Sequence, residues 1–171
     1  MNKIKAALER ARDTKALIIG NGVVCRTAEM FNELFPGQKA IIVADENTWK
    51  VAGADAQKSL DEAGIISYPA FIFPSEDFYA EWKHVETLKA HLEQLDATAI
   101  AVGSGVINDT VKYVSYLLSR KYMCVGTAAS MDGFAYGHLM NPAKDYDRNS
   151  YFSVPFLPGN NCFCHNLLQD S

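Results

Sequence analysis

The segment from Gly103 to Gly105 has the composition of a phosphate-binding turn. An apolar run over residues 98–102 ends at Gly103-Ser104-Gly105, and helical spacing begins at Ile107. Glycines let a bulky anion approach the main chain, and a helix N-terminus offers unpaired N–H groups at the positive end of its dipole. The pattern suits a pyrophosphate, although it departs from G-x-G-x-x-G because position 108 is Asn. The same glycines would equally serve a tight turn whose only role is packing.

A second segment, Val125 to Gly133, combines two hydroxyl side chains with a carboxylate. It follows another apolar run, so in a parallel sheet it would share the carboxyl edge with the first segment. Ligands of open α/β sheets bind along that edge. Thr127 and Ser130 could donate hydrogen bonds there, and Asp132 could accept them. Alternatively, Ser130 or Asp132 would cap a following helix.

A third candidate, Asp45, ends the apolar run of residues 40–44. A carboxylate at this place commonly accepts hydrogen bonds from the ribose hydroxyls of a dinucleotide, and its charge opposes a 2′-phosphate. Asp45 would therefore favour NAD over NADP. The alternative is that Asp45 caps a helix or a turn.

The elements that must position these residues alternate between strands and helices. Apolar runs of strand length recur between segments with helical spacing, and the runs are continuous rather than alternating. Such strands are buried on both faces, which indicates a parallel sheet covered by helices on both sides. The fold class is therefore α/β, with a Rossmann-like sheet. Strands are expected over residues 16–19, 40–44, 65–73, 98–102 and 122–125, and helices near 4–11, 24–35, 51–63, 78–95 and 107–118.

The alternation stops at about residue 137. Residues 137–171 are rich in Asn and Pro and show neither the strand period nor the helix period. A structureless stretch of this length is uncommon inside a compact domain. The sequence therefore predicts a nucleotide-binding domain over residues 1–136 and an atypical C-terminal tail over residues 137–171. A change of reading frame or a gene truncation would explain the break.

Composition excludes several function classes. The 171-residue chain has 16 Lys and Arg against 20 Asp and Glu, so it lacks the cationic excess of a nucleic-acid-binding protein. No apolar run reaches the roughly 20 residues of a membrane span, and the N-terminus has no apolar signal core, which predicts a cytoplasmic protein. Cys25 and Cys124 lie in apolar surroundings and are expected to be buried thiols. Cys162, Cys164 and His165 lack zinc-ligand spacing, so no metal site is predicted.

The first two segments together closely resemble the sn-glycerol-1-phosphate dehydrogenase family. The resemblance rests on residues 103–112, GSGVINDTVK, and residues 127–133, TAASMDG, and it extends over about residues 1–136. This family is part of the superfamily of iron-containing alcohol dehydrogenases, glycerol dehydrogenases and dehydroquinate synthases. Glycerol dehydrogenases usually have Gly-Gly-Gly where this chain has Gly103-Ser104-Gly105.

The resemblance implies an oxidoreductase of phospholipid metabolism, with NAD(P)-dependent, metal-assisted hydride transfer between sn-glycerol 1-phosphate and dihydroxyacetone phosphate. The cofactor would be NAD or NADP, and the substrate a small phosphorylated polyol. Tyr136 occupies a cofactor-contacting position at which the family usually has Ser. The pyrophosphate would bind Gly103, Ser104, Gly105 and Asn108, with Asp109 beside the same loop; Thr127 and Ser130 would lie near the nicotinamide, Asp45 near the adenosine ribose, and Asp132 would bind substrate.

Family members are roughly twice this long and carry a C-terminal helical domain. That domain supplies an Asp and two His as ligands for Zn, Ni or Fe, and the first of them would fall beyond residue 171. His138 and His165 match no ligand position. We therefore expect a truncated dehydrogenase that binds the cofactor without turnover.

Two alternatives stay open. One is a fragment of a glycerol dehydrogenase-like polyol oxidoreductase. The other is a non-catalytic interaction module, in which an exposed apolar patch supports a homodimer. The patch would be formed by Tyr151, Phe152, Val154, Phe156 and Leu157.

Overall fold

A six-stranded parallel sheet forms the centre of the molecule. The computed structural model describes residues 14–76, 81–127, 138–140, 151–153 and 161–166. The strands of the sheet follow the order β1-β8-β5-β4-β2-β3, and each pair of neighbours is parallel. They are β1 (Thr14–Gly20), β2 (Ala40–Asp45), β3 (Phe71–Phe73), β4 (Thr98–Gly103), β5 (Tyr122–Gly126) and β8 (Asn161–Asn166). Two further strands, β6 (His138–Met140) and β7 (Tyr151–Ser153), form a separate antiparallel pair.

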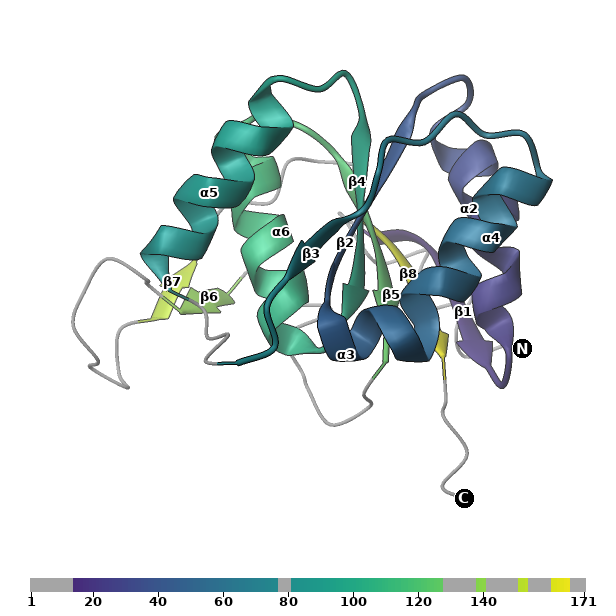
Figure 1. The fold of residues 1–171 in the computed structure, drawn as a ribbon, viewed down its shortest axis with the longest axis horizontal. Coiled ribbons are helices and arrows are strands. Elements are labelled where there is room, and N and C mark those ends of the chain that lie inside the picture. Colours follow the sequence, from purple (N-terminus) through teal and green to yellow (C-terminus); the bar gives the residue numbers. More distant parts are fainter. Residues whose placement is uncertain (1–13, 77–80, 128–137, 141–150, 154–160, 167–171) are drawn as a thin grey trace.

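Helices cover both faces of the sheet (Figure 1). One face carries the 3-10 helix η1 (Val23–Arg26), α2 (Thr27–Leu34) and a continuous helical run made of α3 (Glu46–Thr48), the π-helical turn η2 (Trp49–Gly53) and α4 (Ala54–Glu62). The other face carries α5 (Trp82–Glu93) and α6 (Gly105–Leu117). This is the doubly covered α/β architecture that the continuous apolar strands predict.

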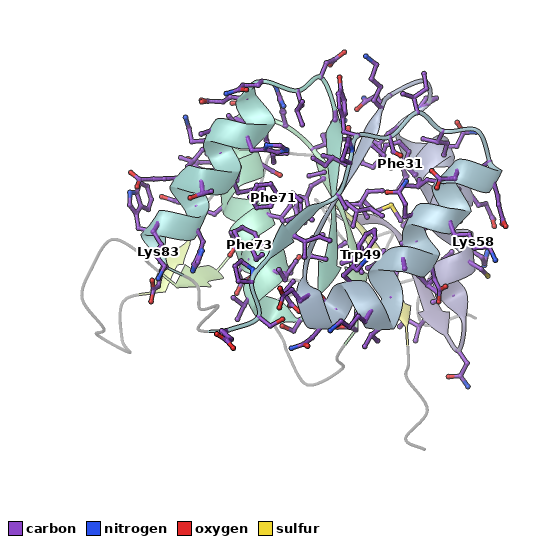
Figure 2. All side chains as sticks on the ribbon, viewed as in Figure 1. Phe31, Trp49, Lys58, Phe71, Phe73 and Lys83 are labelled. Carbon is purple, nitrogen blue, oxygen red and sulfur yellow. The ribbon has the colours of Figure 1, made fainter. Side chains whose placement is uncertain are left out.

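Alternate residues of the central strands pack into two separate cores. In β2, Ile42 belongs to the core beneath α2 and α4, and its neighbour Ile41 belongs to the core beneath α5 and α6. Successive side chains of a strand point to opposite faces, so a strand that is buried on both faces must be apolar throughout. Phe31 of α2 fills the first core and Phe73 of β3 packs into the second (Figure 2).

The segment predicted as a strand over residues 65–73 pairs with β2 only at its two ends. Near its start, Ser67 makes a single bridge to Ala40, and β3 pairs with the last three residues of β2. Pro69 lies between these contacts. Proline has no N–H to donate to a ladder and interrupts regular pairing.

Strand β8 corrects the expectation that residues 137–171 hold no regular element. It lies between β1 and β5: all six of its residues pair with β1, and Asn161 to His165 also pair with β5. The boundary at residue 136 stays a prediction, but β8 follows that boundary in the chain and belongs to the same sheet. Its sequence, NCFCHN, contains Cys162, Cys164 and His165, the group whose spacing does not suit zinc.

The two cysteine predictions have different outcomes. Cys124 is buried in β5, as expected. Cys25 is exposed, so the prediction for it was wrong. In the short helix η1, Val23 and Val24 are the buried residues, and Cys25 points outward on the next position.

The predicted N-terminal helix near residues 4–11 lies outside the described residues. Among the helices that the structure describes, none is long and apolar enough to cross a membrane.

Candidate functional site

The two segments that follow β4 and β5 meet at the carboxyl edge of the sheet. The strand register places Gly103 beside Gly126. The main-chain N–H of Thr127 then donates to the carbonyl oxygen of Gly103 over 3.1 Å. This is the adjacency expected for strand ends in a parallel sheet. β8 extends the row, because the main chain of His165 pairs with Gly126 on its other side.

Gly103 is required for the close packing of α6 on the end of β4. A Cβ atom at this position would lie 2.8 Å from Cγ1 and 2.9 Å from Cβ of Ile107. Ile107 is buried in the first turn of α6 and cannot move far. The packing role that the sequence left open therefore applies to Gly103.

The first turn of α6 has no side-chain cap. Ser104 is the N-cap residue in an extended conformation, and its side chain makes no hydrogen bond to the turn that it precedes. The first turn carries no acidic side chain. A helix N-terminus of this kind presents main-chain N–H groups and the positive end of the helix dipole, which is the arrangement that binds phosphate groups.

Asn108 faces the core, although the resemblance assigned it to a pyrophosphate. Its side chain is fully buried, and its Oδ1 accepts a hydrogen bond from the hydroxyl of Tyr122 over 3.2 Å. Burial raises the pKa of the Tyr122 hydroxyl well above its usual value, so the group stays a neutral donor. The bond ties α6 to the first residue of β5. The amide therefore supports the loop from the core.

A largely buried ion pair lies behind the start of α6. The Nζ atom of Lys112 lies 3.0 Å from Oδ1 of Asp109, and the two side chains are 5% and 22% exposed. Burial raises the pKa of the Asp109 carboxyl, and hydrogen bonds and charge from Lys112, with a hydrogen bond from Asn108, partly offset that rise. Lys112 is not among the predicted site residues. An Asp and a Lys three residues apart share a helix face. Lysines are rarely buried, however, so nothing in the sequence pattern marked Lys112 as a core residue.

Asp45 lies at the carboxyl end of β2, as expected, and caps α3. Its Oδ1 accepts hydrogen bonds from the N–H groups of Asn47 and Thr48, each over 2.8 Å. In return, the hydroxyl oxygen of Thr48 accepts a hydrogen bond from the N–H of Asp45 over 3.0 Å. This reciprocal capping box confirms the capping alternative. The box uses Oδ1 alone, and the predicted contact between Asp45 and a ribose stays a prediction.

Three predicted site residues, Ser130, Asp132 and Tyr136, lie outside the described residues. Thr127 is described and is half-buried beside Gly103. Within the part of the chain that the structure describes, no group of three or more His, Cys, Asp or Glu side chains is placed to hold a metal ion.

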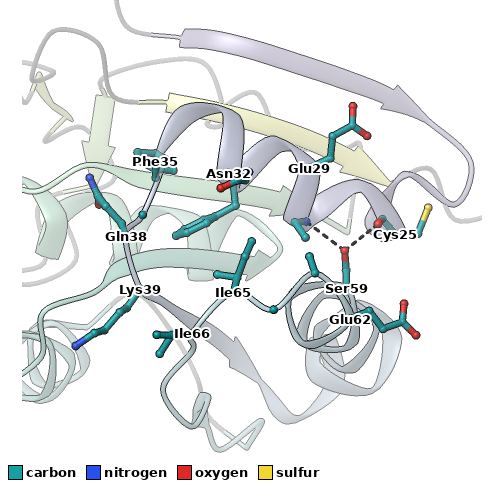
Figure 3. A pocket seen from close by; sticks show the side chains of 15 residues that line it. Cys25, Glu29, Asn32, Phe35, Gln38, Lys39, Ser59, Glu62, Ile65 and Ile66 are labelled. Atoms are coloured by element: carbon teal, nitrogen blue, oxygen red, sulfur yellow. Dashed lines mark hydrogen bonds between the residues drawn. The ribbon is translucent and has the colours of Figure 1, made fainter.

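A cavity of about 650 Å³ lies at the opposite edge of the sheet, near the start of β2 (Figure 3). It lies between α2 and α4 and contains none of the predicted site residues. Beside it, Ser59 links α4 to η1 and α2 on the same face of the sheet, because its Oγ donates to the carbonyl oxygen of Cys25 over 2.8 Å and accepts from the N–H of Ala28 over 3.2 Å. The acidic residues that line the cavity, Glu29 and Glu62, are exposed to solvent. Such groups are well hydrated and give the cavity little selectivity for a ligand.

The doubly covered parallel sheet, with an open helix start at its carboxyl edge, defines an α/β protein of the Rossmann-like class. Residues 18–140 match the sequence model of iron-containing alcohol dehydrogenases. The chain belongs to this family.

Curated relatives carry two kinds of name. A glycerol-1-phosphate dehydrogenase (NAD(P)+) from Bacillus subtilis is 31% identical over 99 residues, which are 57% of this chain and 25% of the relative. A 3-dehydroquinate synthase from Rhizobium leguminosarum is 32% identical over 128 residues, which are 72% of this chain and 33% of the relative. The chain thus spans a quarter to a third of the length of these relatives.

Solved structures share the fold over most of the chain. A glycerol dehydrogenase from Schizosaccharomyces pombe aligns with a TM-score of 0.71 at 18% identity, covering 91% of this chain and 38% of that one. A 2-epi-5-epi-valiolone synthase from Streptomyces hygroscopicus, solved with NAD+ and Zn2+ bound, aligns with a TM-score of 0.65 at 14% identity, covering 88% and 42%. At these identities the likeness concerns the fold alone.

Proposed function

We propose that this chain binds a nicotinamide dinucleotide at the carboxyl edge of its sheet, as the nucleotide-binding part of a glycerol-1-phosphate dehydrogenase-like protein. The observation that carries the proposal is the open start of α6, where Ser104 leaves the first turn uncapped and no acidic side chain is present. A pyrophosphate would satisfy these N–H groups and place its negative charge at the positive end of the helix.

Names of relatives support the choice of ligand. The Bacillus subtilis relative is named for NAD(P)+, and the valiolone synthase structure holds NAD+. We assign the pyrophosphate to the main chain of the Gly103-Ser104-Gly105 turn, with Asp109 beside it, and the adenosine ribose to the oxygen of Asp45 that the capping box does not use. Thr127 and Ser130 would lie near the nicotinamide, with Tyr136 close by, and Asp132 would bind substrate.

The reaction we propose for the whole protein is hydride transfer between sn-glycerol 1-phosphate and dihydroxyacetone phosphate. A bound nicotinamide would supply the hydride carrier, and a divalent metal held outside residues 1–171 would polarise the substrate oxygen. The resemblance assigns the metal ligands to a helical domain outside residues 1–171, so we expect these residues by themselves to bind the cofactor without turnover.

The test is a titration of the chain with NADH, followed by cofactor fluorescence. We expect saturable binding that Val106→Asp weakens about tenfold, or ~1.4 kcal/mol, because a carboxylate in the first turn of α6 would repel the pyrophosphate. Val106 is half-buried at that turn, so the substitution need not disturb the core. ADP-ribose should compete with NADH, because it carries the same pyrophosphate.

The matched control is Leu117→Asp, which adds the same charge at the far end of α6, where Leu117 is 37% exposed. It should leave the dissociation constant of NADH unchanged. Absence of saturable binding at millimolar NADH, or an equal loss in both variants, would contradict the proposal.

A further inference from the structure

The ion pair between Lys112 and Asp109 lies close to the proposed pyrophosphate site. Asp109 is four residues along α6 from Gly105, which places it about 6 Å down the helix axis. A dinucleotide extends beyond its pyrophosphate by a ribose and a base on each side. The carboxylate of Asp109 is therefore within reach of a ligand bound at the start of α6.

Two donors hold this carboxylate through one of its oxygens. Oδ1 of Asp109 lies 3.0 Å from Nζ of Lys112 and 3.5 Å from Nδ2 of Asn108. Lys112 is almost completely buried, whereas the Asp109 side chain keeps 22% of its exposure. Asn108 is itself held by the hydroxyl of Tyr122. The arrangement anchors the carboxylate from the core and leaves part of it open to solvent.

We propose that Lys112 is a positioning residue for cofactor binding. It keeps Asp109 ionised and oriented, so that the open side of the carboxylate accepts a hydrogen bond from a hydroxyl or amide donor of the bound dinucleotide. Lys112 lies too deep to touch the cofactor and acts through Asp109. This inference rests on the proposed function, because it requires a dinucleotide at the start of α6.

The charges around Asp109 give this inference a pH signature. Burial raises the pKa of the Asp109 carboxyl, and Lys112 lowers it. The hydroxyl of Tyr122 in β5 also interacts electrostatically with this carboxylate and with Cys124 on the same strand. Burial and both interactions raise the pKa of Tyr122, which stays neutral. Without Lys112, the carboxyl would keep its proton up to a higher pH. A protonated carboxyl is a poorer acceptor, so NADH affinity would fall as the pH drops through the raised pKa and recover above it.

The experiment measures the dissociation constant of NADH between pH 6 and pH 9 for the wild type, Lys112→Met, Lys112→Arg, Asp109→Asn and the double variant D109N/K112M. At pH 7 we expect Lys112→Met to bind about tenfold more weakly, with affinity that recovers as the pH rises. Lys112→Arg, which keeps the cation, should restore much of the affinity. Asp109→Asn should bind weakly at every pH, and the double variant should be no weaker, because both changes act through one carboxylate.

Thermal unfolding separates positioning from stability. Lys89→Met is the matched control, because Lys89 pairs with Glu93 on the exposed surface of α5 and should not affect NADH binding. Lys112→Gln, which is neutral but keeps an N–H donor, is the second variant, and it should show the same pH profile where Lys112→Met fails to fold.

The outcomes are distinct. No saturation by the wild type would contradict the dinucleotide site and this inference with it. Saturable wild-type binding would leave the site standing, and the inference alone would be overturned by either of two results. One is unchanged affinity in the folded neutral variants at all pH values, and the other is additive losses in the double variant.

Discussion

Two helices begin at the same edge of the sheet, and their first turns are built in opposite ways. After β2, the carboxylate of Asp45 accepts hydrogen bonds from two N–H groups of α3, and Glu46 adds a second negative charge to the turn. After β4, Ser104 makes no such bond to α6, and the first turn has no acidic residue. Both turns follow an apolar strand, and both helices start within a residue or two of its end.

At α3 the protein's own side chain accepts hydrogen bonds from the first-turn N–H groups, whereas at α6 those groups are left for a ligand. The N–H groups of a first helical turn need acceptors, which come from a side chain, from water or from a bound anion. At α3 the chain supplies the acceptor, so an added phosphate would meet occupied donors and a carboxylate. At α6 the donors and the helix dipole are left for an anion. The contrast explains why we place the pyrophosphate after β4 and only a ribose contact after β2.

The largest effect is expected from Gly103→Val, which tests the packing that holds the open turn. A Cβ at Gly103 would lie within 3.0 Å of two atoms of buried Ile107. We expect a loss of about 3 kcal/mol in the free energy of unfolding, measured by urea denaturation, since overpacking costs about that much. NADH binding should be lost too, because α6 would shift away from β4.

Gly37→Ala provides the comparison for this variant. Gly37 has a φ of +75°, but nothing lies within 4 Å of its added Cβ. The cost there is conformational only, about 1 kcal/mol. Equal losses at the two glycines would mean that contact with Ile107 does not determine the requirement for Gly103.

A second substitution, Ser104→Asp, would convert the start of α6 into one like that of α3. The carboxylate would cap the first turn and interact favourably with the helix dipole, so stability should rise by about 0.5 kcal/mol. NADH affinity should fall at least tenfold, since the donors would be occupied and the added charge would repel a pyrophosphate. Opposite changes in melting temperature and in affinity are the result to look for.

The control for Ser104→Asp is Glu81→Asp at the start of α5. Glu81 is also an N-cap residue without a side-chain hydrogen bond to its helix. Asp there can cap α5 but adds no charge, since Glu81 already carries one and pairs with Lys83, so the gain in stability should be smaller and NADH affinity should stay unchanged. If Ser104→Asp strengthens NADH binding, the pyrophosphate does not lie at the start of α6.

The sheet was predictable where the strands are apolar throughout. Residues 40–44 and 98–102 consist of apolar and small side chains with strand length, and both form buried strands at those places. Their order also required Gly103 and Thr127 to lie at one edge, and the hydrogen bond between them is present. β8 was missed because its asparagines and histidine break the continuous apolar pattern that marks the other central strands. Its place between β1 and β5 depends on partners distant in the sequence.

The elements that carry the candidate residues were predictable, but the directions of their side chains were not. The resemblance assigned Asn108 and Asp109 to the pyrophosphate site, but it did not show that the Asn108 amide turns into the core toward Tyr122. It gave no signal for Lys112 either, since the burial of a lysine is decided by the tertiary partners that pay its desolvation cost. At Asp45, the alternation of strand and helix allowed both a cap and a ligand contact. The hydrogen bonds to Asn47 and Thr48 identified the cap.

The smallest effect is expected at Asp45, where two substitutions separate the cap from the charge. Asparagine is as good an N-cap as aspartate, so Asp45→Asn should keep the bonds to Asn47 and Thr48, while Asp45→Ala removes them. Only the alanine variant should lose stability, by about 1 kcal/mol, in urea denaturation. Both variants lose the negative charge that would oppose a 2′-phosphate, so both should bind NADPH more tightly relative to NADH. If only Asp45→Ala shifted the cofactor preference, the shift would come from the loss of the cap, and the proposed ribose contact would be left without support.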